Sequence, residues 1–207
     1  MKKIISCIIC ALLFLPICLN GQDQILSGFQ EHDGFFLRFH AGYGMAKMVE
    51  EGVMGSEMTL TGPAGVFRFQ IGGTVSENLV LFGEIGAFAV TDPTMELGGE
   101  STTLSGSDLT IQDFGAGLTY YIMPANFYFS LSGTMSSDEI KTEGSTGRTE
   151  TGYGVYFSAG KEWWVSADWA LGVAGFAYYS SMDDKWDSAT YPVSNTVFGV
   201  VFSATYQ

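Results

Sequence analysis

Hydrophobic and polar residues alternate one by one along most of the chain after residue 34. In residues 35–44, for example, Leu37 and Phe39 flank Arg38. A period of two is typical of a β-strand with two different faces, because successive side chains point to opposite sides of the sheet. The pattern recurs eight times and predicts strands at residues 35–44, 64–74, 79–90, a segment ending near 122, 127–135, 152–165, 169–180 and 196–206.

The connections between these strands alternate in length. Long polar stretches cover residues 45–62, 91–108, 136–151 and 181–195, and short turns cover 76–78, 123–126 and 166–168. Barrels of the bacterial outer membrane have brief periplasmic turns and longer external loops. Strands of about ten residues also match the ~9–11 needed to cross the hydrocarbon core. We therefore predict an all-β, eight-stranded antiparallel up-and-down transmembrane β-barrel over residues 35–207, with both ends of the chain on the periplasmic side.

The two faces of the predicted strands differ in polarity, since one is almost free of charge. The other face carries the polar residues Arg38, His40, Arg68, Gln70, Glu84, Asp113 and Glu162. In a membrane barrel this face lines a lumen just wide enough for side chains, so the charged groups must pair with one another. We expect a structural network in which Arg68 pairs with Glu84. The alternatives are an ion path or gate, and a soluble barrel with the apolar face inward.

Aromatic residues gather near the ends of the predicted strands. Rings at the two membrane surfaces are typical of outer-membrane barrels. The residues expected in these belts are Tyr43, Tyr120, Tyr121, Phe127, Tyr153, Trp163, Trp164, Trp169, Tyr178, Tyr179 and Tyr206. A second set of bulky residues falls on the inward register, and we expect it to fill the lumen and leave no wide pore: Phe36, Phe82, Phe88, Tyr128, Tyr156 and Phe176.

The first 21 residues have the pattern of an export signal. Lys2 and Lys3 precede an apolar stretch at residues 4–14, and Pro16 precedes a polar exit. We expect cleavage after Gly21, which leaves a lead-in at residues 22–34 with a solvated His32. Cys7, Cys10 and Cys18 all lie in the signal, so the mature chain has no cysteine chemistry. Acylation of Cys18 is the alternative, but no small residue precedes it.

The charge of the chain limits its partners. Nine Lys and Arg residues stand against 22 Asp and Glu, and the net charge is −13. Such a surface has no basic footprint for nucleic acid phosphates. Most of the acids fall in the four long loops, together with four residues that we expect to contact a surface partner: Met54, Met58, Trp186 and Tyr191.

Few residues have a pattern that predicts chemistry. His40 could serve as a catalytic base, but no Ser-x-His or His-x-Ser pair accompanies it, and a catalytic site of this type needs a nucleophile and an acid within reach. The acidic run at residues 183–187 lacks the alternating ligands and the glycine of a calcium loop. We expect no catalytic residue, metal or cofactor.

Three segments carry a resemblance to a known family. They are the FGAGLTYY run at residues 114–121, the GKEWW run at 160–164 and the closing strand with Phe198, Phe202 and Tyr206. The chain resembles the small outer-membrane β-barrel family, the OmpX/OmpA-like eight-stranded proteins. The resemblance implies a setting of outer-membrane lipid and lipopolysaccharide, and recognition of the last strand by the assembly machinery. The chain ends on Gln207, where the family usually ends on phenylalanine.

These observations favour a bacterial outer-membrane barrel with a packed polar lumen. Its expected role is structural, or the binding of a surface partner through the four long acidic external loops. The alternatives are an enzyme that modifies outer-membrane lipids and a narrow channel for small solutes.

Overall fold

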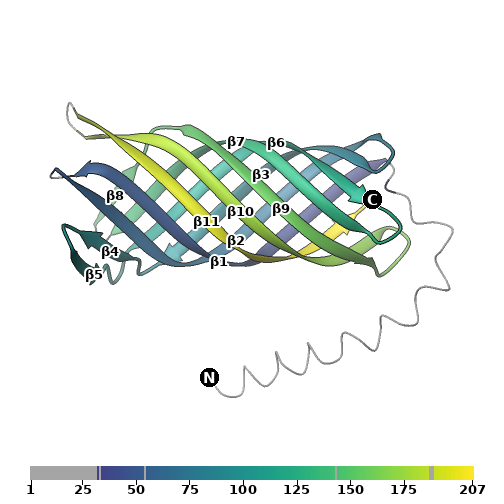
Figure 1. Cartoon of the computed structure of the whole chain (residues 1–207), viewed down its shortest axis with the longest axis horizontal. Coiled ribbons are helices and arrows are strands. Elements are labelled where there is room, and N and C mark those ends of the chain that lie inside the picture. Colours follow the sequence, from purple (N-terminus) through teal and green to yellow (C-terminus); the bar gives the residue numbers. More distant parts are fainter. Residues whose placement is uncertain (1–31, 33, 54, 143, 187–188) are drawn as a thin grey trace, which may run out of the picture. The chain divides into compact units, whose positions relative to one another are not determined.

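The computed structural model describes residue 32 and residues 34–53, 55–142, 144–186 and 189–207. The predicted signal at residues 1–21 and nearly all of the lead-in at 22–34 lie outside these residues. Residues 32–207 form one compact unit built from β-strands (Figure 1). Among the described residues, no helix is long and apolar enough to cross a membrane.

Eight long antiparallel strands form a closed ring. They are β1 (Phe35–Val53), β2 (Ser56–Ser76), β3 (Leu79–Thr91), β6 (Asp108–Ile122), β7 (Phe127–Thr142), β9 (Gly152–Trp164), β10 (Trp169–Trp186) and β11 (Ala189–Tyr206). Each strand pairs with the next in this order, and β1 pairs with both β2 and β11. Leu37, for example, lies opposite Ile71 on one side and Tyr206 on the other. The predicted all-β, eight-stranded barrel is confirmed.

The strands are longer than the sequence pattern indicates, because hairpin pairing continues into the predicted loops. The β1–β2 ladder runs on to Val53 opposite Ser56, and the β10–β11 ladder runs on to Trp186 opposite Ala189. The stretches at 45–62 and 181–195 are therefore mostly β-structure, and their prediction as loops is wrong. The inward alternation persists there as well, since Met48 is buried.

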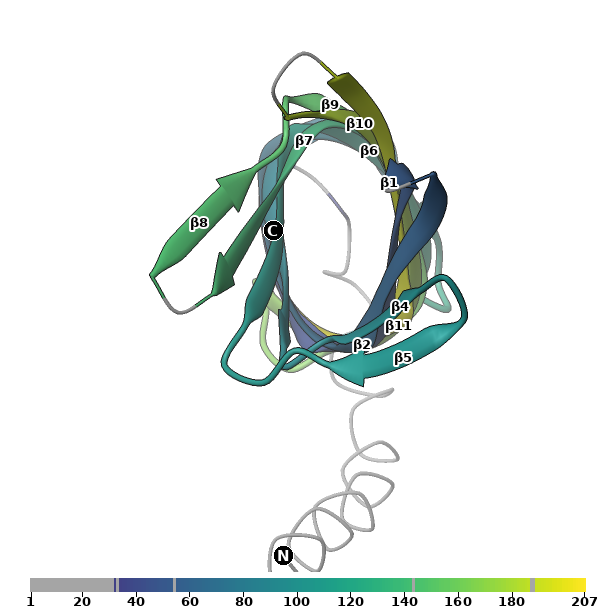
Figure 2. The same ribbon diagram turned by 90° about the vertical axis from the view of Figure 1, so that its left-hand side faces the viewer.

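Three short strands stand outside the ring at the same end (Figure 2). β4 (Thr94–Leu97) pairs with β2 and with β5 (Glu100–Thr103), and β8 (Ser145–Arg148) pairs with the end of β7. These hairpins occupy most of the predicted loops at 91–108 and 136–151. We call this end of the barrel, with its extended hairpins, the hairpin end, and the opposite one the short-turn end.

The barrel has its apolar side chains on the outside. From Phe127 to Ser136 in β7 the exposed positions alternate strictly with buried ones. The exposed large apolar side chains come from all eight long strands, and their middle members include Phe39, Phe67, Ile85, Phe114, Leu131, Phe157, Val173 and Val200. The inward residues include the predicted charged set. A soluble barrel would have the opposite arrangement, so the structure contradicts that alternative.

Candidate functional site in the barrel lumen

A buried arginine with two carboxylates occupies the middle of the lumen. Arg68 of β2 lies 2.7 Å from Glu84 of β3 (Nη1 to Oε1) and 2.5 Å from Asp113 of β6 (Nη2 to Oδ2), and all three side chains are fully buried. A Cβ on Gly86 would lie 2.7 Å from Arg68 Cζ, so only glycine at this position leaves room for the guanidinium. The expected pairing of Arg68 with Glu84 is present, and Asp113 is a second partner.

Aromatic rings complete the surroundings of Arg68. Its Cζ lies 3.9 Å from the centroid of the Tyr156 ring and 5.4 Å from that of Phe88. Cation–π contacts of this kind stabilise a desolvated guanidinium. The lumen at this level therefore holds a cation that is paired with two carboxylates and packed against aromatic rings, while Arg68 Nε has no hydrogen-bond partner among the described residues.

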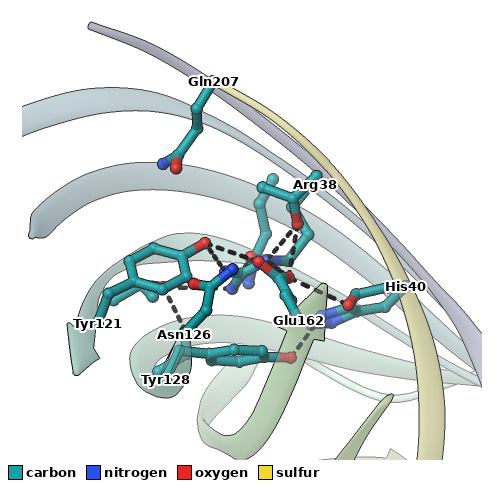
Figure 3. A network of polar contacts seen from close by, with 12 residues as sticks. Arg38, His40, Tyr121, Asn126, Tyr128, Glu162 and Gln207 are labelled. Carbon is teal, nitrogen blue, oxygen red and sulfur yellow. Dashed lines mark hydrogen bonds and ion pairs between the residues drawn. The ribbon is translucent and has the colours of Figure 1, made fainter. Parts of the chain in front are cut away.

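A second buried arginine lies nearer the short-turn end (Figure 3). Arg38 Nε lies 3.3 Å from Glu162 Oε1 and donates to Thr205 Oγ1 at 3.1 Å, while Nη2 donates to Tyr121 Oη. Glu162 also accepts hydrogen bonds from Thr205 at 2.7 Å and Ser203 at 3.1 Å. Both charges of this cluster have partners, as a structural network requires.

Gln70 connects the two clusters. Its Oε1 accepts from Arg38 Nη1 at 3.4 Å, and its Nε2 donates to Glu84 Oε2 at 2.9 Å. Ser132 donates to the other oxygen of Glu84. The lumenal residues Arg38, Arg68, Gln70, Glu84, Asp113 and Glu162 are thus brought into one continuous network.

His40 lies in the same lumen without catalytic partners. Its Nε2 is 3.3 Å from Tyr128 Oη, and its Nδ1 has no hydrogen-bond partner among the described residues (Figure 3). No serine hydroxyl or carboxylate of the described residues forms a hydrogen bond with the ring. The nucleophile and acid that a triad needs are therefore not assembled around this histidine.

His32 closes the short-turn end, contrary to the expectation that it is solvated. Its ring is buried, stacks on Tyr121, lies 2.8 Å from Asn126 (Nε2 to Oδ1) and contacts Gln207 through Nδ1. Burial lowers the pKa of His32 to about 4, so the ring is neutral. The sequence has no signal for this contact, because it joins a residue before the first strand to a turn and to the C-terminus.

Bulky side chains fill the space around the network. Phe36, Phe82, Phe88, Tyr128, Tyr156 and Phe176 are all buried inside the barrel, as the inward register predicts. Gly117 accommodates one of these rings, since a Cβ there would lie 2.7 Å from Phe82 Cζ.

For three of the predicted belt aromatics, the structure contradicts the prediction that they face the membrane surface. Tyr121, Trp164 and Tyr178 are buried inside the barrel. Each has an aromatic neighbour in sequence, and in a strand two successive side chains point to opposite faces, so only one of each pair can face outward. The remaining belt aromatics point outward, and all but Tyr43 and Tyr179, which lie within β1 and β10, are close to a strand end: Tyr43, Tyr120, Phe127, Tyr153, Trp163, Trp169, Tyr179 and Tyr206.

The predicted loop contacts are only partly described. Met54 and the side chain of Trp186 lie outside the described part of the chain. Met58, in β2, and Tyr191, in β11, are half-buried. Among the described residues of this set, none is a fully exposed anchor.

A buried carboxyl group lies at the hairpin end of the lumen. Asn195 Nδ2 donates to Asp138 Oδ2 at 2.7 Å and to Ser180 Oγ at 3.1 Å. Within the described residues, no group of three or more His, Cys, Asp or Glu side chains could hold a metal ion.

The architecture is similar to that of solved bacterial surface and outer-membrane proteins. No family model and no curated protein sequence matches the chain. The solved structure of Neisserial surface protein A, from Neisseria, is similar over 84% of this chain and 96% of that one, with 12% identity and a TM-score of 0.50. The outer membrane protein OprG from Pseudomonas aeruginosa is similar over 85% and 98%, with 11% identity and a TM-score of 0.51. At these identities the likeness shows the fold alone.

Proposed function

We propose that this chain, which has the fold of the small eight-stranded outer-membrane β-barrels, is a closed barrel of the bacterial outer membrane that presents its extended hairpins to a surface partner. The observation that carries the proposal is the continuous outward face of apolar side chains on all eight strands. Such a face is stable against lipid and would aggregate in water.

The contents of the lumen support a closed barrel. Two arginines are paired with three carboxylates, and aromatic side chains pack against both guanidinium groups. Because these groups are already in contact, solute movement would require breaking buried ion pairs. This favours a structural role for the network over a narrow channel, and the setting of His40 gives no support to a lipid-modifying enzyme.

The orientation follows from the lengths of the connections, with the hairpin end outside the cell and the short-turn end in the periplasm. In this orientation lipopolysaccharide surrounds the hairpin end of the apolar face. The last strand keeps an alternation of exposed apolar residues at Phe198, Val200 and Phe202, which supports recognition of β11 by the assembly machinery.

The surface role rests on the lobe made by the outer halves of β1 and β2 with β4 and β5. Glu57, Glu96 and Glu100 are exposed there. Glu96 of β4 lies opposite Thr59 of β2, the residue that follows Met58 in the sequence. None of these three glutamates forms an ion pair with a described residue, whereas Glu139 on β7 is paired with Lys141 and Arg148. The lobe therefore favours a partner with a basic surface.

Neutralising the lobe tests this role. Cells that display the triple variant Glu57→Gln/Glu96→Gln/Glu100→Gln should adhere to a surface coated with a basic protein roughly threefold less than cells with the unchanged barrel, and added salt should remove the difference because it screens exposed charges. The matched control is Glu77→Gln, in the turn after β2 at the short-turn end. Equal adhesion of the triple variant would contradict the surface role and leave an envelope-structural one.

A further inference from the structure

One charged side chain interrupts the apolar outer face of the barrel. On the outward side of the described strands, from the short turns up to the level of Met45 and Met135, Lys161 of β9 is the only charged residue. It lies opposite Phe127, the first residue of β7, and is therefore close to the short-turn end. A charge in this position costs stability unless it meets water, a partner or a lipid headgroup.

The ammonium group of Lys161 is held in a fixed position. Nζ donates a hydrogen bond to the Ala125 carbonyl oxygen at 2.8 Å and lies 4.7 Å and 5.7 Å from the ring centroids of Phe127 and Trp163. An ammonium group has three N–H donors, and the Ala125 contact uses one. No carboxylate of the described residues lies within ion-pair distance of Lys161. The group is thus oriented by the protein and still available to an anion.

A groove in the outer face begins at this lysine. It has a volume of about 430 Å³ and is lined by residues of β6, β7, β9 and β10. These four strands are consecutive in the sheet (Figure 1). Its lining includes the small residues Ala159 and Gly160 and the larger side chains of Phe129 and Val173. The lining thus combines one lysine near the short-turn end with apolar residues one step further along the strands, where Ala159 lies opposite Phe129.

We propose that this groove binds one phospholipid of the periplasmic leaflet, with the lipid phosphate at Lys161 Nζ and an acyl chain over Ala159 and Gly160. The inference rests on the proposed membrane location of the barrel. Charge complementarity selects the occupant, because a lone cation between two aromatic rings at the membrane surface fits a phosphate ester, and the apolar lining of the groove fits the chain attached to it. The aromatic rings and the Ala125 carbonyl position the ammonium group for this contact.

Native mass spectrometry of the refolded barrel in detergent tests the site. The probes are dimyristoylphosphatidylglycerol and dimyristoylglycerol, which carry the same acyl chains with and without a phosphate. We expect the unchanged barrel to retain one phosphatidylglycerol and Lys161→Gln to retain about fivefold less, since one interfacial lysine contributes about that factor. Lys161→Arg should keep the lipid. Lys47→Gln is the matched control, because Lys47 is an exposed, outward lysine of β1 beyond the opposite edge of the apolar face.

A variant of the apolar lining separates the two parts of the site. Ala159→Phe should fill the groove and lower the retention of phosphatidylglycerol while the lysine stays in place. Equal retention by Lys161→Gln and the unchanged barrel, or equal binding of dimyristoylglycerol, would overturn the proposal. An equal loss in Lys47→Gln would also overturn it, because binding would then follow total charge.

The same samples distinguish this inference from the proposed function. Each barrel is inserted into lipid vesicles and run unheated on a semi-native gel, where a folded barrel migrates differently from the heated chain. A barrel that inserts but shows no preference for the phosphate refutes only the lipid site. A chain that does not insert refutes the membrane location and, with it, the lipid site.

Discussion

Replacing Arg68 with alanine is expected to destabilise the barrel by about 3–5 kcal/mol, the usual cost of leaving a buried charge without its partner. The Arg68 guanidinium contacts Glu84 and Asp113, and none of the three side chains is accessible to solvent. Removing the cation leaves two carboxylates facing each other in a confined space. Urea unfolding in lipid vesicles, followed by tryptophan fluorescence, measures the loss.

A double-mutant cycle isolates the interaction between Arg68 and Glu84. Because Glu84→Gln removes one of the stranded charges, the double variant should lose less stability than the sum of the two single variants. Arg148→Ala is the control, since Arg148 forms its ion pair with Glu139 on the exposed part of β7 and its removal should change little. Strict additivity in the cycle would show that the two lumenal residues do not stabilise each other.

Placing an arginine in the middle of the apolar outer face is the second change with a large expected effect. Leu131 of β7 is 56% exposed and points away from the lumen. In lipid, Leu131→Arg should cost about 2–4 kcal/mol, the usual penalty for a charged side chain near the bilayer midplane. The measurement is the same unfolding experiment, together with the fraction of barrel that inserts into vesicles.

Ser137→Arg is the matched control for this change. Ser137 lies on the same strand and the same face as Leu131, six residues closer to the hairpin end. An arginine there is near the membrane surface or beyond it, where the penalty falls to about 0–1 kcal/mol. If both variants unfolded alike, the outer face would not be in contact with hydrocarbon.

The barrel itself could be predicted because its physical cause is local. The alternation of apolar and polar side chains in each strand indicates that its two faces have different environments. The lengths of the connections distinguish the hairpin end of the barrel from the short-turn end. The ends of the strands could not be placed in the same way. Beyond Met45 the charged residues Lys47 and Glu51 enter the outward positions of β1, while Met48 and Leu60 remain buried. The change in composition therefore marks the end of the apolar face and not the end of the β-ladder.

The lumenal residues could be assigned to the inward face, but most of their partners could not. Asp113 reaches Arg68 from β6, two strands away from β2, and Glu162 on β9 reaches Arg38 on β1 across three strand pairings. Such contacts depend on strand tilt and on how the ring closes, which no single segment encodes. The same is true of His32, whose contacts to Asn126 and Gln207 join distant parts of the chain.

Single-channel recording in planar lipid bilayers tests the closed, membrane-spanning barrel most directly. The refolded protein is first checked for insertion by its heat-modifiable migration on gels. An absence of current then cannot result from a lack of inserted protein. The lumen is filled by paired charges and aromatic rings, and we therefore expect no large, stable conductance steps from inserted protein. Stable, porin-like steps on the nanosiemens scale would contradict the closed lumen.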